Sequence, residues 1–510
     1  MLVSARYFAA ADLGASSGRV ILGRLEDGRF ELTETTRFEN GPIETADGIH
    51  TDARGLFEHV RVGVQAAIDA SGGALESVGV DTWGVDYGRL DASGELLESP
   101  FHYRDERTHG VPDLVFSTLS AEQLYGTAGL QVMPFNTIFQ LVAGRVDGRW
   151  GAVDKVLLMP DLMSFWLCGR HVAEMTMAST TGLLDVASRT WSDRTCAHLA
   201  QRYGLPVPRV LPELVEPGTV LGETTAGLFS QPVRVVAVGG HDTASAVASI
   251  PASGTDFAFI SSGTWSLVGL ELEQPVLTEA SRAADFTNEL GIDGTVRYLK
   301  NVMGLWVLSE SIRAWKAAGR AVELGALLDA AADRPGLACV LDMTDERLLP
   351  PGDMPSRLLA MAAETGQALP DDPATICRCI LDSLAVAYRA TIRDACQLAG
   401  RDVSVVHIVG GGCQNTLLCQ LTAEATGLPV VAGPAEGTAL GNLLVQARAC
   451  GALSGDRKAL REVAIASSAL TTYHPGVLPF APEQWDAAER AANRTAALPS
   501  PRPTTGVADG

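Results

Sequence analysis

Short apolar runs separated by glycine-containing turns dominate the beginning of the chain. Residues 7–11 form one such run, and residues 20–25 and 30–38 form two more on either side of Asp27-Gly28. Runs of this length that end at turn residues predict β-strands, and an Asp-Gly pair between two of them predicts a hairpin. We therefore expect three strands joined by tight turns before residue 39.

A helical periodicity follows between residues 52 and 70. One face of the predicted amphipathic helix carries Leu56, Val60, Val64 and Ile68. Residues 77–81 then form another apolar run, which predicts a further strand. Three hairpin strands, a helix and a strand in this order resemble the ribonuclease-H-like unit found in hexokinase, actin and Hsp70.

The same order of elements recurs in the second half. Residues 256–261 and 265–270 predict two strands around the turn Ser262-Gly263-Thr264, and residues 403–409 predict a later strand. The long apolar helix expected before that strand carries on one face Ile376, Ile380, Leu384 and Ile392. Because the element order repeats while the residues do not, the pattern suggests an internal duplication.

We therefore predict an α/β protein of two ribonuclease-H-like domains, of the actin, hexokinase and Hsp70 ATPase type, that face each other across a cleft. The predicted domains are residues 1–247 and 248–455, followed by an extension over residues 456–510. Beyond Pro475 the chain becomes rich in proline and alanine, and we expect residues 499–510 to be a disordered tail.

Charge and cysteine content narrow the function classes. Lys and Arg number 39 against 60 Asp and Glu, a net charge of −21, which argues against nucleic acid or an anionic membrane as partner. Lysine is scarce, so anion binding must use arginine, backbone amides or a metal. Nine scattered cysteines favour reduced thiols in the cytoplasm. With no secretion signal or long apolar stretch in the sequence, we expect a cytoplasmic monomer or small homo-oligomer.

An apolar run near the middle of the chain ends in a cluster of polar residues. Residues 235–238 predict a buried strand, Gly239-Gly240 free the backbone, and His241, Asp242 and Thr243 follow before an alanine-rich helical segment. Such a turn holds a carboxylate rigidly at a strand end, so Asp242 is a candidate general base for a hydroxyl proton. The alternative is that Asp242 only caps the helix, where Asp is favoured.

A second polar turn lies between the first two predicted strands. Gly14 and Gly18 allow backbone amides to crowd around a phosphate, Ser16 adds a donor and Arg19 adds charge. Asp12, just before the turn, can hold a hydrated Mg²⁺. Glycine-rich hairpins also occur without any ligand. The turn matches the Gly-x-Ser-x-Gly pattern of esterases as well, although that motif requires a strand that turns into a helix.

Four further segments are open to more than one interpretation. Trp83 is either a sugar-stacking surface or part of the core. Residues 101–108 combine charges and aromatic rings that either line a sugar site or form a solvated, salt-bridged turn. The hydroxyl groups in residues 174–181 are either ligand contacts or, as we favour, bonded to their own turns. The glycines at 410–412 precede a helix and allow close approach of a nucleotide.

Five of these motifs together resemble the FGGY family of carbohydrate kinases. The similarity runs in order from about residue 7 to residue 450. The motifs are Asp12-Leu13-Gly14-Ala15-Ser16-Ser17-Gly18-Arg19, Asp81-Thr82-Trp83-Gly84-Val85-Asp86, Ser261-Ser262-Gly263-Thr264-Trp265-Ser266, Lys300-Asn301-Val302-Met303-Gly304-Leu305-Trp306 and Gly410-Gly411-Gly412-Cys413-Gln414-Asn415. They are jointly specific, and they favour the general-base interpretation of Asp242.

The resemblance implies transfer of the ATP γ-phosphoryl group, with Mg²⁺, to the 1-hydroxyl of L-rhamnulose, a step of L-rhamnose catabolism. It assigns the sugar mainly to the first domain and the nucleotide mainly to the second, with Asp242 as proton acceptor. Sugar contacts are implied for Gly84, His241, Asp242, Thr243 and Asn301. ATP contacts are implied for Ala15, Ser16, Ser17, Gly18, Arg19, Thr264, Ser309 and Gly411. Ser309 is shorter than the glutamine that relatives carry at this place.

Two alternatives share these motifs. A kinase of the same fold for another ketose or polyol, such as L-fuculose or D-xylulose, would differ in the side-chain geometry of the sugar site. A non-catalytic, actin-like nucleotide switch would bind ATP and act on a protein partner instead of a sugar.

Overall fold

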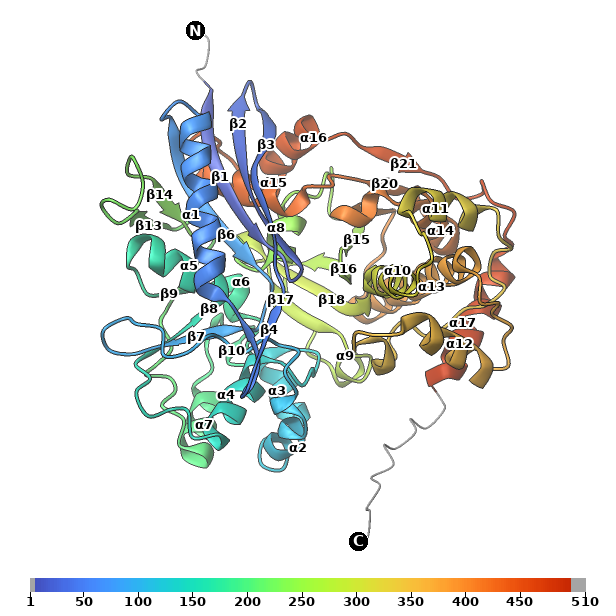
Figure 1. The fold of residues 1–510 in the computed structure, drawn as a ribbon, viewed down its shortest axis with the longest axis horizontal. Helices are drawn as coiled ribbons and strands as arrows, with labels where there is room; N and C mark the ends of the chain where they lie inside the picture. The colour runs from blue at the N-terminus through green and yellow to red at the C-terminus, as the bar shows by residue number, and fades with distance from the viewer. Residues whose placement is uncertain (1–4, 497–510) are drawn as a thin grey trace.

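The computed structural model describes residues 5–496 and contains two large mixed β-sheets joined through a central pair of helices (Figure 1). The first sheet has the order β13 (Val220–Glu223), β14 (Arg234–Val236), β6 (Leu75–Thr82), β1 (Arg6–Leu13), β2 (Ser17–Glu26), β3 (Arg29–Glu39). The second has the order β17 (Thr287–Leu290), β18 (Val296–Met303), β16 (Trp265–Leu272), β15 (Phe257–Ser262), β19 (Val405–Val409), β20 (Val430–Ala432), β21 (Thr471–Tyr473).

The two sheets repeat one topology. In the first, β1 pairs antiparallel with β2 and parallel with β6. In the second, β15 pairs antiparallel with β16 and parallel with β19. The strands β14 and β20 extend the parallel side of each sheet. This repeat confirms the predicted α/β fold of two ribonuclease-H-like domains, and it brings the turn after β1 and the turn after β15 to equivalent places.

Alternating side chains on β1 explain why both faces of the first sheet are covered. Successive side chains of a strand point to opposite faces. Ala9 and Ala11 pack in the cluster that contains the buried face of α1 (Ala53–Ala70), whereas Phe8 and Ala10 pack with α15 (Gly437–Ala449). The run is therefore apolar throughout, as expected for a strand buried on both sides.

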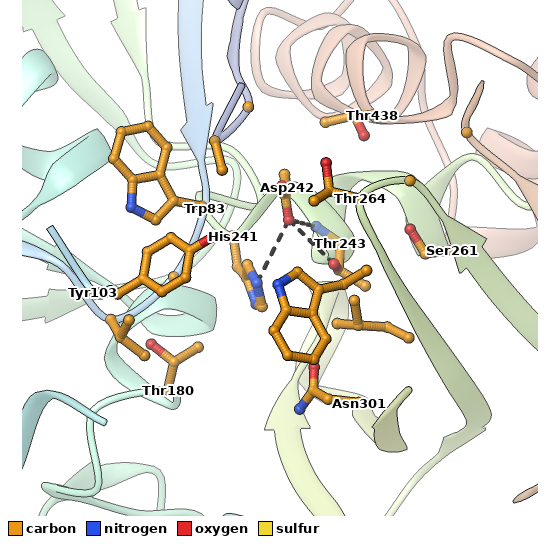
Figure 2. Close-up of a pocket in the computed structure, with 18 of the residues that line it drawn as sticks. Trp83, Tyr103, Thr180, His241, Asp242, Thr243, Ser261, Thr264, Asn301 and Thr438 are labelled. Atoms are coloured by element: carbon orange, nitrogen blue, oxygen red, sulfur yellow. Dashed lines mark hydrogen bonds and ion pairs between the residues drawn. The ribbon is translucent and has the colours of Figure 1, made fainter. Parts of the chain in front are cut away.

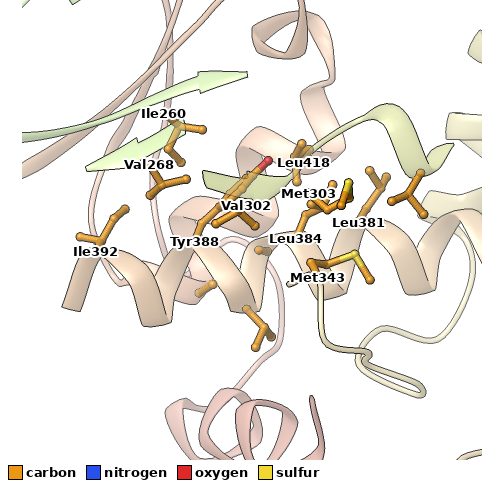
Figure 3. Packing of buried hydrophobic residues seen from close by; sticks show 14 of the residues in the cluster. Ile260, Val268, Val302, Met303, Met343, Leu381, Leu384, Tyr388, Ile392 and Leu418 are labelled. Atoms are coloured by element: carbon orange, nitrogen blue, oxygen red, sulfur yellow. The ribbon is translucent and has the colours of Figure 1, made fainter. Parts of the chain in front are cut away.

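The long helix α13 (Pro373–Ala399) builds the core of the second domain. Figure 3 shows Tyr388 and Ile392 of this helix near the sheet residues Ile260 and Val268, and Leu384 and Leu381 farther along the helix near Met303. The Tyr388 hydroxyl lies 2.6 Å from the hydroxyl of Ser266, so its polar end is also satisfied in the interior. The predicted apolar face of this helix is confirmed.

The helices α8 (Asp242–Ala248) and α15 cross closely between the sheets. A Cβ atom at Gly441 would lie 1.7 Å from the carbonyl oxygen of Ser245, so only glycine fits at this crossing. Beside it, Gln446 Nε2 donates to the Ala9 carbonyl at 2.8 Å and Ser77 Oγ donates to Gln446 Oε1 at 2.6 Å. The second half of the chain is thus tied to the first sheet by buried hydrogen bonds as well as apolar packing.

The remaining elements surround these two layers. The strands are β4 (Pro42–Thr45), β5 (Gly48–Thr51), β7 (Tyr87–Leu90), β8 (Lys155–Leu158), β9 (Val172–Glu174), β10 (Leu184–Asp185), β11 (Thr190–Trp191) and β12 (Glu213–Val215). The helices are α2 (Val111–Phe116), α3 (Ala121–Ala128), α4 (Thr137–Val146), α5 (Met159–Cys168), α6 (Met175–Ala178), α7 (Asp193–Tyr203), α9 (Glu279–Ala283), α10 (Trp306–Ala317), α11 (Leu324–Ala332), α12 (Met354–Glu364), α14 (Thr416–Thr426), α16 (Arg457–Ser467) and α17 (Pro482–Ala496). Short 3₁₀ turns are η1 (Glu106–Thr108), η2 (Ile292–Gly294), η3 (Glu346–Leu348) and η4 (Gly411–Gln414).

The predicted domain limits at residues 247 and 455 stay predictions. The first falls inside α8, and the second precedes α16 and β21, of which β21 joins the edge of the second sheet. The predicted tail, residues 499–510, lies outside the described residues. All nine cysteines are unbridged. In the described part of the chain, none of the helices combines the length and the apolar character needed to cross a membrane.

Candidate active site

A cavity of about 320 Å³ lies between the two sheets, and residues of both line it (Figure 2). Its walls come from the turn after β1, the segment after β6, the start of α8, the turn after β15 and the glycines after β19. Of the predicted site residues it contains Asp12, Ala15, Ser16, Ser17, Arg19, Gly84, His241, Asp242, Thr243, Thr264, Asn301 and Gly411. Segments more than 400 residues apart along the chain therefore meet at one site.

The turn between β1 and β2 presents charge and hydroxyl groups to this cavity. Gly14 N–H donates to the Ser17 carbonyl at 2.9 Å and closes the turn, which leaves Ser16 and Ser17 exposed in the cavity. Gly18 does not line the cavity: a Cβ atom there would lie 2.3 Å from the Phe38 ring, so this glycine is needed for packing. Because a strand and not a helix follows, the turn is not a nucleophile elbow.

Asp12 and Arg19 face each other across the hairpin. They are paired in the β1–β2 register, and Arg19 Nη2 and Nε donate to Asp12 Oδ2 at 2.8 and 3.1 Å. Arg19 also lies 2.8 Å from Glu436, which belongs to the second half of the chain. Burial lowers the pKa of Arg19, and the carboxylates of Asp12 and Glu436 more than offset it, so that its pKa is raised and the guanidinium stays charged. The arginine therefore places a fixed positive charge beside the hydroxyls of the turn.

Asp242 is the first residue of α8, and its carboxylate points into the cavity (Figure 2). Its Oδ1 accepts hydrogen bonds from the Thr243 N–H at 2.6 Å and the Thr243 hydroxyl at 3.1 Å, and it lies 3.5 Å from His241 Nε2. The residue in the N-cap position is His241, so the interpretation of Asp242 as a mere cap is wrong. These contacts leave the second carboxylate oxygen without a hydrogen-bond donor among the described residues.

Burial raises the pKa of Asp242, and the neighbouring negative charge of Asp12 raises it further, although His241 opposes the shift. The side chain still keeps 32% of its exposure because the cavity opens onto it. A carboxylate with a raised pKa is a stronger base than a solvated aspartate, and it remains accessible to a small acceptor molecule.

A third carboxylate, that of Asp81, lies next to Asp12. Asp81 is not among the site residues predicted from the sequence. It is paired with Asp12 in the β1–β6 register and is fully buried. Asn442 Nδ2 of α15 donates to its Oδ2 at 2.6 Å, while its Oδ1 has no partner among the described residues. Burial raises the pKa of Asp81 well above the ordinary value, and Asp12 adds to the rise. The neutral form of Asp81 is thereby favoured next to the two other acids.

The second sheet contributes a turn of neutral groups. Gly263 N–H donates to the Trp265 carbonyl at 2.8 Å, and Ser261 and Thr264 lie along the cavity (Figure 2). The glycines after β19 pack directly against this turn: a Cβ at Gly412 would lie 2.0 Å from Ser262 Oγ, and Gly410 has φ of +82°. Close approach of two backbone segments therefore explains these glycines, and Gly411 remains open toward the cavity.

The wall beyond Asp242 is richer in aromatic and amide groups. Trp83 is buried yet lines the cavity, and its Nε1 donates to Asp86 at 2.9 Å. Asp86 is also held by Gln140 Nε2 at 3.1 Å, and because burial outweighs these hydrogen bonds the pKa of Asp86 is raised to about 7. Tyr103 lines the same wall, and it is the residue of the segment 101–108 that reaches the cavity, whereas Arg104 to Arg107 are partly or fully exposed.

Asn301 is held in place by a residue that the sequence did not indicate. Gln131 Oε1 accepts from Asn301 Nδ2 at 3.0 Å and from the Asn301 N–H at 3.3 Å, and both side chains line the cavity. On the opposite wall, Thr180 donates to its own turn through the Met177 carbonyl at 2.9 Å, as expected for residues 174–181, although it also reaches the cavity.

Ser309 is a predicted site residue that lies outside this arrangement. It lies on α10, is exposed, and does not line the cavity. Residues that the sequence did not indicate include Gln131, Thr287 and Glu289, which line the cavity, and the buried Asp81 next to Asp12. Thr287 and Glu289 lie two residues apart on β17 and so share one face, but Asn288 between them is polar too, so the sequence carries no alternation that would have identified them.

Comparison with known proteins gives one consistent result for both halves of the chain. Residues 7–249 match the model of the N-terminal domain of the FGGY family of carbohydrate kinases, and residues 258–450 match the model of the C-terminal domain of that family. A rhamnulokinase of Bacteroides thetaiotaomicron is 40% identical to this chain, and the matched region covers 94% of this chain and 97% of that protein. A rhamnulokinase of Pectobacterium carotovorum is 39% identical to this chain, and the matched region covers 93% of this chain and 94% of that protein.

Solved structures show the same fold at low sequence identity. A gluconate kinase from Lactobacillus acidophilus has a TM-score of 0.77 at 16% identity and covers 97% of both chains. A glycerol kinase from Plasmodium falciparum, determined with ADP, has a TM-score of 0.74 at 12% identity, with 97% of this chain and 98% of its own covered. At these identities the likeness concerns the arrangement of the two domains.

Proposed function

Since this chain belongs to the FGGY family of carbohydrate kinases and phosphorylates a sugar with ATP, we propose that its acceptor is L-rhamnulose and that its products are L-rhamnulose 1-phosphate and ADP. The proposal of the acceptor is supported by the rhamnulokinases at 39 and 40% identity, which cover more than nine-tenths of the chain. The observation that carries the chemistry is the position of Asp242, whose carboxylate faces a cavity lined by the polar turns of both sheets.

In the proposed reaction Asp242 accepts the proton of the 1-hydroxyl as that oxygen attacks the γ-phosphorus. The Thr243 N–H and hydroxyl hold Oδ1 of the carboxylate, so the other oxygen faces the acceptor. Phosphoryl transfer depends on in-line positioning and on charge stabilisation more than on covalent help from the protein. Arg19 and the exposed hydroxyls of Ser16 and Ser17 supply positive charge and donors for the phosphate oxygens.

The remaining assignments follow the two walls of the cavity. We place the sugar between Gly84, His241 and Asn301, and the nucleotide phosphates between Ala15 and the backbone of Thr264 and Gly411. Approach of the two domains would exclude water, which otherwise competes with the sugar as acceptor. Ser309 has no part in this arrangement, since it is exposed on α10 away from the cavity.

The residues around Asp12 fit a Mg²⁺ ion bound together with ATP. Only Oδ2 of Asp12 is engaged by Arg19, and no donor among the described residues occupies Oδ1. Mg²⁺ is commonly held by one or two carboxylates, water and substrate phosphates, and residues 5–496 accordingly contain no cluster of three acidic, histidine or cysteine side chains for a metal. When bound, the ion would neutralise charge on the phosphate oxygens.

A substrate panel tests the proposal. ADP release from Mg-ATP would be measured with L-rhamnulose, L-fuculose, D-xylulose and glycerol at equal concentrations. We expect the highest kcat/KM with L-rhamnulose. A higher kcat/KM with another acceptor would overturn the substrate while leaving the kinase reaction in place, and ATP binding without release of ADP with any acceptor would favour a nucleotide switch.

A further inference from the structure

A buried ion pair forms part of the sugar-side wall of the cavity. Glu289 and Arg297 are cross-strand partners on β17 and β18, and Arg297 Nη1 lies 3.1 Å from Glu289 Oε2. Arg297 is completely buried and Glu289 is 6% exposed. Burying two charges is costly and rarely improves stability over apolar residues of the same size, so a pair kept in such a place calls for a role besides folding.

Both members of the ion pair contact His241. The imidazole Nδ1 lies 3.0 Å from Glu289 Oε2 and 3.2 Å from Arg297 Nη2, and its Nε2 lies 3.5 Å from Asp242 Oδ1. Arg297 is itself fixed, because its Nε donates to the Leu290 carbonyl at 3.1 Å. The ring of His241 is therefore held between the ion pair on one side and the candidate base on the other.

Glu289 also reaches the cavity. Thr287 and Glu289, two residues apart on β17, both line it, as does Asn301 on the neighbouring strand. Oε2 of Glu289 faces His241 and Arg297 at ion-pair distance but lacks a hydrogen bond of regular geometry, and Oε1 makes no hydrogen bond within the described part of the chain. Although burial alone would raise the pKa of Glu289, the charge of Arg297 and the contact with His241 lower it below the ordinary value. The carboxylate is thus an ionised acceptor with a free oxygen.

We propose that Glu289 is a specificity-determining residue that accepts a hydrogen bond from a hydroxyl of the sugar remote from the reacting 1-hydroxyl. The inference deepens the proposed function and rests on it. An acceptor carboxylate in a closed site favours sugars that present a donor there and disfavours those that do not, because an unpartnered buried acceptor is left behind.

The test compares a full-length and a truncated acceptor in the Glu289→Gln variant. Dihydroxyacetone carries the reacting hydroxymethyl ketone but lacks the distal hydroxyls of L-rhamnulose. We expect Glu289→Gln to lower kcat/KM for L-rhamnulose by about 10- to 100-fold, the range for a hydrogen bond to a charged group. The kcat/KM for dihydroxyacetone should change by less than about 3-fold, so that selectivity between the two acceptors falls.

A matched control comes from a second buried ion pair, which joins the same sheet to α16. The side chain of Glu271 on β16 is 6% exposed, against 8% for that of Glu289, and lies 2.9 Å from Arg461, but Glu271 does not line the cavity. Glu271→Gln should lower the melting temperature as Glu289→Gln does, since each leaves a buried arginine unpaired, yet it should leave the selectivity between the two acceptors unchanged. The double variant Glu289→Gln/Arg297→Met removes both charges, and we expect it to recover melting temperature without recovering selectivity.

Equal loss of kcat/KM for both acceptors in Glu289→Gln, or full selectivity in the double variant, would overturn the inference. These outcomes are separate from a failure of the proposed function, which would appear in the unmodified protein as the absence of ketose-dependent ADP release.

Discussion

The turn between β1 and β2 and the turn between β15 and β16 occupy equivalent places in their sheets, yet only the first carries charge. The first brings Asp12 and Arg19 to the cavity, whereas the second brings Ser261, Ser262 and Thr264. Both turns are closed by one backbone hydrogen bond, from Gly14 N–H in the first and from Gly263 N–H in the second. The repeated topology therefore supplies two turns with similar backbones. Their side chains give the two turns different roles.

The difference shows why proton transfer is assigned to the first half of the site. The charge of Asp12 raises the pKa of both Asp81 and Asp242, Asp242 also raises that of Asp81, and Arg19 is the cation beside Asp12. The second turn has hydroxyl and backbone groups that can hold a nucleotide without affecting a proton equilibrium. Four substitutions test this division, from the largest expected effect to the smallest.

Removing the candidate base should have the largest effect. Asp242→Asn keeps the shape of the side chain but loses its basicity, and we expect kcat to fall by ~10²–10⁴. Asn can still accept from Thr243, so the melting temperature should stay within a few degrees. Steady-state ADP release with L-rhamnulose and a thermal melt measure both quantities. A kcat within about 3-fold of the unmodified protein would remove Asp242 from the reaction.

Neutralising the cation of the first turn should have the second largest effect. Arg19→Gln loses the charge that faces Asp12 and Glu436, and we expect kcat/KM for ATP to fall by about 10- to 100-fold, the range for hydrogen bonds to charged groups. Arg24→Gln, on the same strand but pairing with Glu26 away from the cavity, is the control and should leave kcat/KM unchanged. Equal activities of the two variants would contradict a role for Arg19 at the phosphates.

A neutral group of the second turn should matter less. Thr264→Ala removes one hydroxyl from the cavity, and we expect the KM for ATP to rise by about 2- to 10-fold with little change in kcat, since a neutral hydrogen bond contributes a net ~0.5–1.5 kcal/mol. Initial rates at varied ATP concentration separate the two constants. A fall in kcat as large as that of Asp242→Asn would mean that the two turns do not divide the work as described.

Ser309 should have the smallest effect. Its side chain is exposed on α10 and outside the cavity, so Ser309→Ala should leave the KM for ATP within about 2-fold, the usual range for surface substitutions. A rise of the KM beyond 5-fold, measured in the same initial-rate assay, would show that the nucleotide extends over α10 as the family resemblance implies.

The sequence predicted the sheets and the charged turn because these rest on local patterns. Apolar runs, the Asp27-Gly28 hairpin with positive φ at both residues, and the four-residue spacing on α1 identify elements without knowledge of the fold. Family motifs then identified Asp242 and Asn301 as site residues, and the structure brings both to one cavity.

Residues whose role depends on pairing between distant strands could not be predicted in this way. Asp81 lies at a strand end like Asp12, but its full burial and its bond to Asn442, 361 residues later, depend on the packing of α15. Glu289 and Arg297 look like ordinary charged residues in the sequence, and only the β17–β18 register and the place of His241 make them an ion pair in the cavity wall.

The pH dependence of phosphoryl transfer tests the central claim, that Asp242 is the proton acceptor, most directly. Burial and Asp12 raise the pKa of Asp242, so the unmodified protein should lose kcat as the pH falls through a value above the ordinary aspartate pKa of about 3.9. The residual kcat of Asp242→Asn, measured over the same range, should lack this acidic limb. An acidic limb at the same pH in both proteins would show that another group accepts the proton.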